Sequence, residues 1–332
     1  GTGKKYVIKA QEKTSGPTIT NSGTIEAGLS YAIDVNKSVG SVITNNAGGI
    51  IKSLRYTING SDAATSNTTI TNSGSIYLTE KEEVIQFSNA TGTTITNNAG
   101  GEIYRDIGAI GSHPTIQIGP SSSITNSGQI RDDSSIDWAL SLDGNTTTVT
   151  NNSGGLFGGE IRITASATGA TLINSGTIAA QSPSDRAIFV KGDNATVTLK
   201  DKGIVVGTIE ATGTGTKLQL QQGFGRTYFY ETSGEFTLED LSGNTVVKGS
   251  AGSVSLGRQE TVDELLGLRA FNLRSALKRY ASAPKPSDDN MVWGETFGYS
   301  SKRGGTDTLL KYDTYGYGMN FIHPVTSKLD LI

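Results

Sequence analysis

Apolar and polar positions alternate in short stretches along residues 1–200, and the stretches recur with nearly the same spelling. Residues 18–25 read TITNSGTI, and related phrases begin at Val42, Thr69, Thr94, Ser123, Val149 and Leu172. One asparagine follows the first strand of every copy: Asn21, Asn45, Asn72, Asn97, Asn126, Asn151 and Asn174. These asparagines are separated by 24, 27, 25, 29, 25 and 23 residues. Such a period predicts a solenoid of stacked β-coils.

Each unit contains the pattern of three strands. Ile70 lies between two threonines, so it faces the core while they face outward. The turn at 72–74 uses asparagine and glycine, which tolerate the left-handed conformation. Strands at 75–78 and 84–87 follow, and the last of these recurs at 31–35, 115–118, 138–142 and 187–190. The fold class is therefore all-β, a three-sided parallel β-helix, in which the turn asparagines stack about 4.8 Å apart and pass an amide hydrogen bond along the column.

The repeat weakens near residue 201, and the pattern changes. Alternating stretches at 217–220, 227–230, 235–238 and 245–247 carry larger aromatic residues. We expect 201–258 to cap the open end of the coil stack, because an uncovered edge exposes unpaired backbone groups.

A helix is predicted at 259–281. Thr261 and Glu264 have the spacing of a capping box. An apolar stripe follows with a helical period: Val262, Leu265, Leu266, Leu273, Ala276, Leu277 and Tyr280. Acidic residues lie at its start and basic residues towards its end, as the helix dipole favours. A proline-containing linker at 282–290 then ends the helix.

Two strand-like stretches follow at 291–299 and 312–321, the first containing Trp293, and a third begins at 328–331. In the second stretch Tyr315, Tyr317, Met319 and Phe321 share one face, and small or polar residues share the other. Large apolar groups on one face with small or polar groups on the opposite face are typical of transmembrane β-barrel strands.

Composition narrows the function classes. The chain has 43 glycines, 7 prolines, no cysteine and a net charge of −3. No basic stripe is present, so a nucleic-acid partner is not expected. The absence of cysteine excludes disulfides and thiolate metal sites. The sequence contains no run of about 18 apolar residues, so no membrane-spanning helix is predicted. Residues 1–9 lack the apolar region of a signal peptide, so any such segment is missing or lies outside this sequence.

The order of these parts resembles a Gram-negative autotransporter of type V secretion: β-helix repeats, a closing β segment, an amphipathic helix, and glycine- and tyrosine-rich strands that open at Trp293. The resemblance implies a surface passenger at 1–200, an autochaperone-like segment at 201–258, a helix in the barrel pore at 259–281, and the first translocator strands at 291–332. It also implies an outer-membrane and cell-surface location, with the barrel assembly machinery and periplasmic chaperones as partners. Such barrels have more strands than this sequence supplies, so we expect a truncated barrel.

Candidate catalytic residues are few. His113 precedes Pro114, with no nucleophile elbow and no acid at a fixed spacing, and is expected to be a loop histidine. His323 also precedes a proline and is read as structural. Asp132, Asp133 and Asp137 could bind calcium or act on a glycosidic bond, but no calcium repeat accompanies them, and solvated loop charges are the expectation. The mixed charges at 80–83 are read in the same way. No catalytic residue, metal site or cofactor is predicted.

The sequence thus favours a non-enzymatic surface stalk that serves adhesion or aggregation through a ligand on a host or neighbouring cell. The alternatives are a polysaccharide-active β-helix enzyme, or a stalk that carries a hydrolase domain upstream. A phage or S-layer-like fibre would explain the repeats but not the helix and the barrel-like strands.

Overall fold

The computed structural model describes residues 6–10, 15–28, 30–106, 108–109, 112–134, 137–223, 228–244, 246, 256–283, 293–304 and 312–322. The chain divides into two compact units. The first is Gly1–Gly243 with Val247–Ser253, and the second is Asn244–Val246 with Val254–Ile332.

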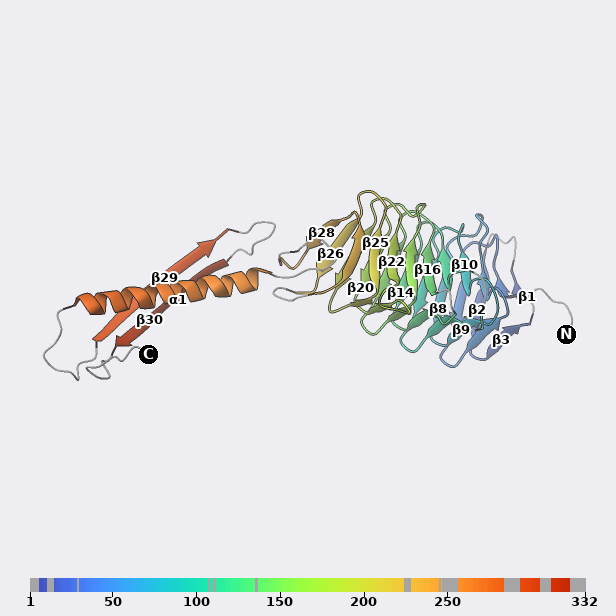
Figure 1. Ribbon diagram of the computed structural model, residues 1–332. Coiled ribbons are helices and arrows are strands. Elements are labelled where there is room, and N and C mark those ends of the chain that lie inside the picture. Colours follow the sequence, from blue (N-terminus) through green and yellow to red (C-terminus); the bar gives the residue numbers. More distant parts are fainter. Residues whose placement is uncertain are drawn as a thin grey trace. The chain divides into compact units, whose positions relative to one another are not determined.

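The first unit is a parallel β-solenoid with three sheets, which confirms the predicted fold class (Figure 1). Sheet A stacks β1 (Tyr6–Lys9), β4 (Tyr31–Asp34), β7 (Ile58–Asn59), β10 (Ile85–Phe87), β13 (Ile116–Ile118), β16 (Trp138–Leu142), β19 (Glu160–Ile163), β22 (Arg186–Val190), β25 (Thr208–Ala211) and β27 (Glu231–Gly234). Sheet B stacks β2 (Thr18–Asn21), β5 (Val42–Asn45), β8 (Thr69–Asn72), β11 (Thr94–Asn97), β14 (Ser123–Asn126), β17 (Thr148–Asn151), β20 (Thr171–Asn174), β23 (Thr196–Lys200), β26 (Lys217–Gln221) and β28 (Thr237–Asp240). Sheet C stacks β3 (Thr24–Ala27), β6 (Ile50–Ser53), β9 (Ser75–Leu78), β12 (Glu102–Arg105), β15 (Gln129–Asp132), β18 (Leu156–Gly158), β21 (Thr177–Ala179) and β24 (Ile204–Val206).

Each coil visits sheet B, then C, then A, and the next coil repeats the order in register. In sheet B, Ile95 of β11 pairs with Ile70 of β8 and Ile124 of β14. All three isoleucines are buried. The alternation read from the sequence therefore places one apolar column from each sheet in a narrow shared core, because successive side chains of a strand point to opposite faces.

The turn asparagines form a continuous buried column at the corner between sheets B and C. The Nδ2 atom of each donates to the Oδ1 atom of the next, over 2.8–2.9 Å, in six successive links from Asn21 to Asn174. The same Nδ2 atoms also donate to backbone carbonyls; Asn97, for example, donates to Gly101 and Gln129, each over 3.1 Å. The expected amide ladder is thus present, and it also satisfies carbonyls of the corner.

The corners alternate between two forms, so the structural repeat is a pair of coils. A short corner reads Asn-Ser-Gly, and the next reads Asn-Asn followed by a small residue and two glycines. The second asparagine of each long corner donates to the serine of the preceding short corner: Asn46 to Ser22, Asn98 to Ser73 and Asn152 to Ser127, over 2.8–2.9 Å. This outer row of contacts accompanies the buried column.

Glycine is required at the corner by the close approach of coils. A Cβ atom on Gly74 would lie 2.2 Å from the carbonyl oxygen of Gly49, and one on Gly128 would lie 2.2 Å from that of Gly101. Backbone oxygens of the preceding coil cannot move away without breaking the stack. The recurring glycine therefore serves the stacking distance itself.

The predicted capping segment begins as further coils. Strands β24 to β28 extend the same three sheets beyond residue 201. The predicted strands at 227–230 and 235–238 are displaced, because pairing with β25 and β26 places the strands at β27 and β28 instead. Tyr228 donates to the carbonyl of Gly203 over 2.9 Å, and Tyr230 is buried. A chaperone-like role for 201–258 stays a prediction.

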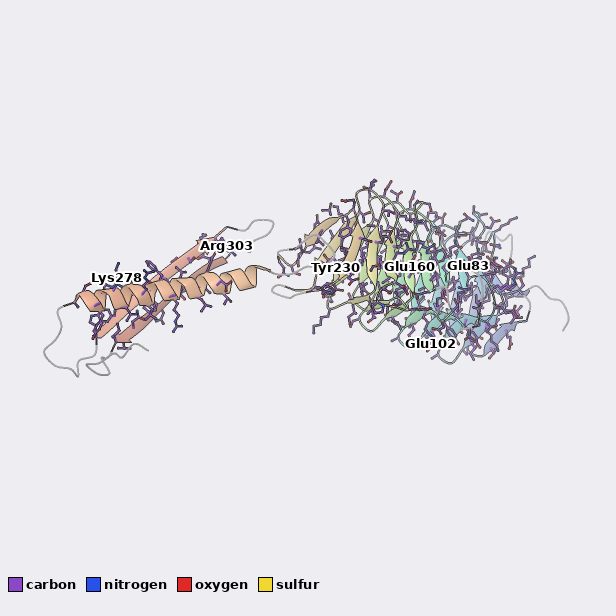
Figure 2. The ribbon with its side chains drawn as sticks, viewed as in Figure 1. Glu83, Glu102, Glu160, Tyr230, Lys278 and Arg303 are labelled. Atoms are coloured by element: carbon purple, nitrogen blue, oxygen red, sulfur yellow. The ribbon has the colours of Figure 1, made fainter. Side chains whose placement is uncertain are left out.

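The second unit contains helix α1 (Leu256–Ser282) and an antiparallel hairpin of β29 (Trp293–Arg303) and β30 (Tyr312–Ile322). The helix lies along one face of the hairpin. Tyr280 packs edge-on against Trp293 with ring centroids 5.9 Å apart, and Arg279 pairs with Glu295. Arg303, labelled in Figure 2, pairs with Glu264 over 2.7 Å. The helix face of the hairpin is therefore partly polar.

The opposite face of the hairpin is open; it is apolar in β30, whereas β29 contributes Gly294, Thr296, Gly298, Ser300 and Lys302 to it. Tyr315 and Tyr317 are 85% and 93% exposed, and Met319 and Phe321 are also exposed. The predicted two-faced pattern is thus present in β30. His323 and the predicted strand at 328–331 lie outside the described residues.

The predicted helix is present, and its start lies three residues before the expected one. Helix α1 begins at Leu256, so Thr261 lies within it. The side chain of Thr261 lies outside the described residues, and the capping box stays a prediction. Glu264 pairs with Arg303 over 2.7 Å. Arg258, Gln259 and Glu260 are good helix formers, which allows the extension. The predicted apolar stripe is only partly covered, because Val262, Leu266, Leu273 and Leu277 are exposed whereas Ala276 is buried. Within the described residues, no helix is long and apolar enough to cross a membrane.

We predict that Asn97→Ala destabilises the solenoid by about 1–3 kcal/mol, the cost of leaving buried polar partners unsatisfied. Asn72 would lose its acceptor, and Asn126 would lose its donor. The matched control is Asn98→Ala, which removes one outer contact to Ser73 and should cost less than about 1 kcal/mol. Urea unfolding followed by circular dichroism compares the two. Equal losses would contradict a special role for the buried column.

Candidate functional site

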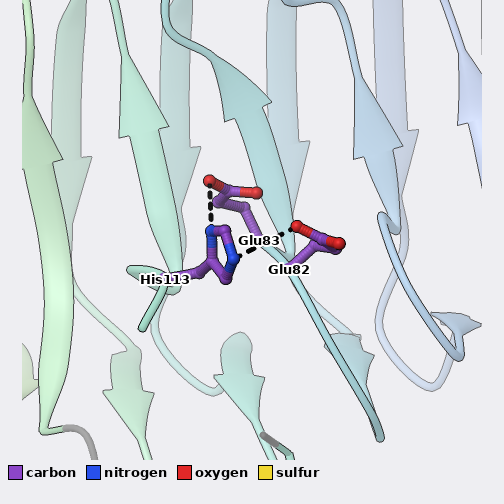
Figure 3. Close-up of side chains that lie close together, drawn as sticks. All are labelled: Glu82, Glu83 and His113. Carbon is purple, nitrogen blue, oxygen red and sulfur yellow. Dashed lines mark hydrogen bonds and ion pairs between the residues drawn. The ribbon is translucent and has the colours of Figure 1, made fainter. Parts of the chain in front are cut away.

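Aligned loops on the sheet A side of the solenoid bring together a cluster of ionisable side chains. Glu82 and Glu83 precede β10, and His113 precedes β13 of the next coil. Because Ile85 pairs with Ile116, the residues before these strands are also neighbours. His113 Nδ1 lies 3.2 Å from Glu83 Oε1, and His113 Nε2 lies 3.2 Å from Glu82 Oε2. Figure 3 shows the imidazole held between the two carboxylates.

The two carboxylates differ in environment. Glu83 is 3% exposed, and burial raises the pKa of its carboxyl although His113 opposes the shift. Glu82 is less enclosed. Burial would raise its pKa too, but the hydrogen bond from Arg55 and the charge of His113 hold the pKa of Glu82 below its ordinary value. Tyr56 also donates to Glu82, over 3.1 Å. Glu82 has a φ of 74°, an uncommon conformation for a residue with a side chain.

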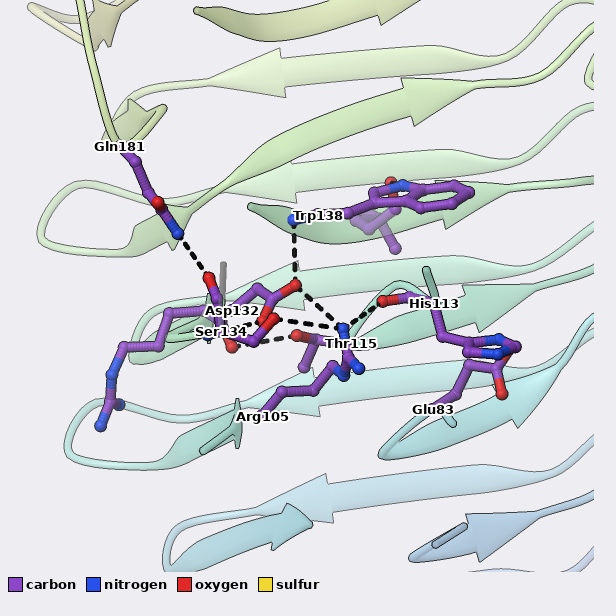
Figure 4. Close-up of polar contacts among 10 residues, drawn as sticks. Glu83, Arg105, His113, Thr115, Asp132, Ser134, Trp138 and Gln181 are labelled. Atoms are coloured by element: carbon purple, nitrogen blue, oxygen red, sulfur yellow. Dashed lines mark hydrogen bonds and ion pairs between the residues drawn. The ribbon is translucent and has the colours of Figure 1, made fainter. Parts of the chain in front are cut away.

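A buried ion pair lies directly beside this cluster. Arg105, at the end of β12, is fully buried, and its Nη1 atom lies 3.2 Å from Asp132 Oδ2 at the end of β15. The same Nη1 atom donates to the backbone carbonyl of His113 over 2.6 Å (Figure 4). Asp132 also accepts from the backbone N–H groups of Ser134 and Trp138. The guanidinium therefore ties the loop of His113 to the next coil.

The expectation of solvated charges was wrong for Asp132. Its side chain is fully enclosed, because it occupies the inward position of sheet C that pairs with Arg105. One coil earlier, the same position is occupied by Leu78. Opposite charges at one inward position of adjacent coils are the sequence signal that would have identified the pair. The expectation holds for Asp133, which is exposed and pairs with Arg131 over 2.9 Å.

Asp137 is the third carboxylate of the predicted group. Burial, the main cause, raises its pKa to about 6, and the nearby Asp132 and Asp185 add to the shift. Its Oδ2 atom accepts from the backbone N–H of Gln181 over 2.9 Å, and the Gln181 side chain donates to the carbonyl of Ser134. Asp137 also has a positive φ of 57°. It joins loops that are two coils apart.

His113, expected to be a loop histidine, is such a residue, but both its ring and its carbonyl have specific partners. Within the described part of the chain, the group of histidine and carboxylate atoms close enough together to hold a metal ion is Glu82, Glu83 and His113. The spacing of these residues in the sequence did not reveal the group, because its members come together only when one coil stacks on the next. To predict this group, the lengths of the loops between the strands must be known.

The chain was compared with protein-family models, with curated proteins and with solved structures, and none of them matches it.

We predict that Arg105→Met destabilises the protein by about 3–5 kcal/mol, because Asp132 would be left as a buried charge without its partner. The double variant Arg105→Met with Asp132→Asn removes both charges and should recover at least half of the loss. Denaturant midpoints of the wild type and both variants measure this. A double variant no more stable than the single one would contradict the assigned pairing.

We predict a pH-dependent effect of Asp137→Asn. The folded-state pKa of Asp137 is raised to about 6, so its protonated form contributes stability that is fully present below about pH 4 and is lost as pH rises through 6. Asparagine keeps an acceptor for Gln181 and tolerates positive φ. The variant should therefore be more stable than the wild type at pH 8, by about 1 kcal/mol after allowance for solvent screening. At pH 4 the difference should vanish. A gain that is the same at both pH values in thermal melts would contradict the assignment.

Proposed function

We propose that the chain is a rigid, non-enzymatic stalk displayed at the surface of a Gram-negative bacterium, anchored through an outer-membrane β-barrel to which the second unit belongs. In this proposal the solenoid is the passenger of an autotransporter. It holds a binding surface for a host or neighbouring cell away from the membrane, in adhesion or aggregation.

The observation that carries the proposal is the two-faced hairpin. One face of β30 presents Tyr315, Tyr317, Met319 and Phe321 to its surroundings. On the other face of the hairpin, β29 meets α1 through the ion pairs of Arg279 with Glu295 and Arg303 with Glu264 and through the ring of Trp293. A lipid-facing apolar band with a polar interior is the pattern of membrane β-barrel strands. Contacts between α1 and this partly polar face fit a helix held inside such a barrel.

The solenoid suits a stalk because each coil is stabilised by its neighbours rather than by a separate core. Its asparagine column continues through six links without interruption. Repeat proteins propagate folding between neighbouring units. We propose that the passenger emerges with its C-terminal end first and that coils near β24 to β28 template the earlier ones, with periplasmic chaperones and the barrel assembly machinery acting upstream.

The enzyme alternative has less support from the geometry. A glycoside hydrolase needs two carboxylates that reach the scissile bond. Asp132 has no exposed side-chain surface and is occupied by Arg105, Ser134 and Trp138. His113 is held by two glutamates, whereas a nucleophile triad needs a serine or cysteine beside it. These observations favour a structural use of both clusters.

The proposal is tested by protease shaving of intact bacteria that produce the complete protein, followed by mass mapping. Release of peptides from the solenoid unit, with protection of the region from α1 to β30, is the expected result. Failure to release any solenoid peptide from intact cells, with release after lysis, would contradict surface display.

We predict that Tyr317→Arg lowers the amount of folded protein in the outer membrane, because an arginine on the lipid face costs about 2–4 kcal/mol near the bilayer midplane. The matched control is Thr314→Arg, which places the same charge on the other face of β30. Heat-modifiable migration of the outer-membrane fraction on gels reports folded barrel. Equal incorporation of the two variants would contradict the assignment of the faces.

A further inference from the structure

We propose that Glu82, Glu83 and His113 form a binding site for a divalent transition-metal ion, best matched by Zn²⁺, which links two successive coils of the solenoid. This inference is independent of the proposed surface role. Each residue offers one ligand atom, and these atoms lie within 4.8 Å of one another. The imidazole lies between the two carboxylates, with one ring nitrogen toward each (Figure 3).

The donor set selects the class of ion. One imidazole nitrogen with two carboxylate oxygens suits zinc and its neighbours, whereas calcium and magnesium prefer oxygen ligands alone. Zinc binds such ligands at about 2.0–2.2 Å, so ligand atoms of one site lie roughly 3–3.5 Å apart. The contact of 3.2 Å from His113 Nε2 to Glu82 has this spacing, and so does the contact of 3.2 Å from Nδ1 to Glu83; one ion takes one of the two nitrogens. Small side-chain rotations would bring the remaining ligands within reach, and water would complete the coordination.

A second observation points to a cation. The Glu83 side chain is 4% exposed, and its Oε2 atom has no hydrogen-bond partner among the described residues. A buried carboxylate oxygen without a partner is costly. Both imidazole nitrogens face carboxylate oxygens, an arrangement that a protonated ring satisfies with two N–H groups and that an ion satisfies in place of one ring proton. A divalent ion would satisfy the free oxygen, use the ring lone pair and neutralise two carboxylates at once.

The groups around the three ligands are arranged as metal sites require. Arg55 and Tyr56 bind the Glu82 carboxylate over 2.9 and 3.1 Å. Arg105 fixes the backbone of His113 through its carbonyl oxygen over 2.6 Å. Such outer contacts orient ligands, and their loss commonly lowers metal affinity by about 10–100-fold. The orphaned oxygen therefore lies in a site whose other atoms are held in place.

The ion would join two coils that otherwise meet through strand pairing. Glu82 and Glu83 belong to the coil of β8 to β10, and His113 belongs to the coil of β11 to β13. Because the ion binds only when both coils are folded and stacked, its binding free energy adds to the stability of the stack. Zinc should therefore raise the temperature at which the solenoid unfolds.

The test is isothermal titration of the full chain, purified in detergent and stripped with a chelator, with ZnCl₂ at pH 7.5. Thermal melts with and without zinc provide the second readout, and the visible absorption of Co²⁺ in place of zinc reports the coordination geometry. Three variants remove ligands one at a time: His113→Gln, Glu83→Gln and Glu82→Gln. The matched control is His323→Gln, since His323 is the other histidine of the chain.

We expect one zinc ion per chain, a higher melting temperature with zinc, and a loss of affinity of about 100-fold or more in His113→Gln and Glu83→Gln, as removal of a direct ligand should exceed the effect of an outer contact. His323→Gln should bind as the wild type does. Circular dichroism of each metal-free variant shows whether the solenoid is folded, and Glu82→Gln serves if a buried substitution prevents folding. No saturable zinc binding by the wild type, or wild-type affinity in all three ligand variants, would overturn the proposal.

Discussion

The column of buried asparagine amides is the interaction on which the rest of the solenoid depends. Each amide donates to the next coil and to the corner carbonyls, so the polar groups of a buried turn are satisfied only while the coils stay in register. A slip by one residue would turn every apolar side chain of a strand outward and break the column at the same time. The glycine at the corner allows the coils to stack this closely, because a Cβ atom there would clash with backbone oxygens of the preceding coil.

A register fixed at one corner determines what the loops on the other sides can do. Strands β10, β13 and β16 are aligned, so residues that precede them are brought together although they are far apart in the chain. Glu83 meets His113 in this way, and Arg105 meets Asp132 through β12 and β15. Variation in loop length therefore changes the chemistry on the outside without disturbing the core. Loop residues at equivalent positions of adjacent coils form the sites.

Much of the fold could be predicted because one short phrase recurs. The asparagine, the inward aliphatic residue and the glycine have the same physical role in every copy, so an assignment made for one copy applies to all seven. The clusters could not be predicted in the same way. Asp132 looked like a solvated loop charge because the sequence shows three nearby aspartates, and only the sheet C register reveals that it lies opposite a buried arginine.

Helix α1 shows a second limit of prediction from the sequence, because a local pattern does not show contacts with distant residues. Thr261 and Glu264 have the spacing of a cap, but a spacing is local, and the preceding residues are themselves compatible with a helix. The partner of Glu264 is Arg303, which lies far along the chain and enters only with the hairpin. Strand faces in the hairpin were predictable because a period of two residues assigns them directly.

Side-chain amide hydrogen exchange of the asparagines, followed by nuclear magnetic resonance, tests the central claim most directly. The account predicts that the Nδ2 hydrogens of Asn45, Asn72, Asn97, Asn126 and Asn151 exchange far more slowly than those of Asn46, Asn98 and Asn152, which lie on the outer row. Exchange at one common fast rate in both groups would contradict a continuous buried column, and with it the proposed basis of the stack.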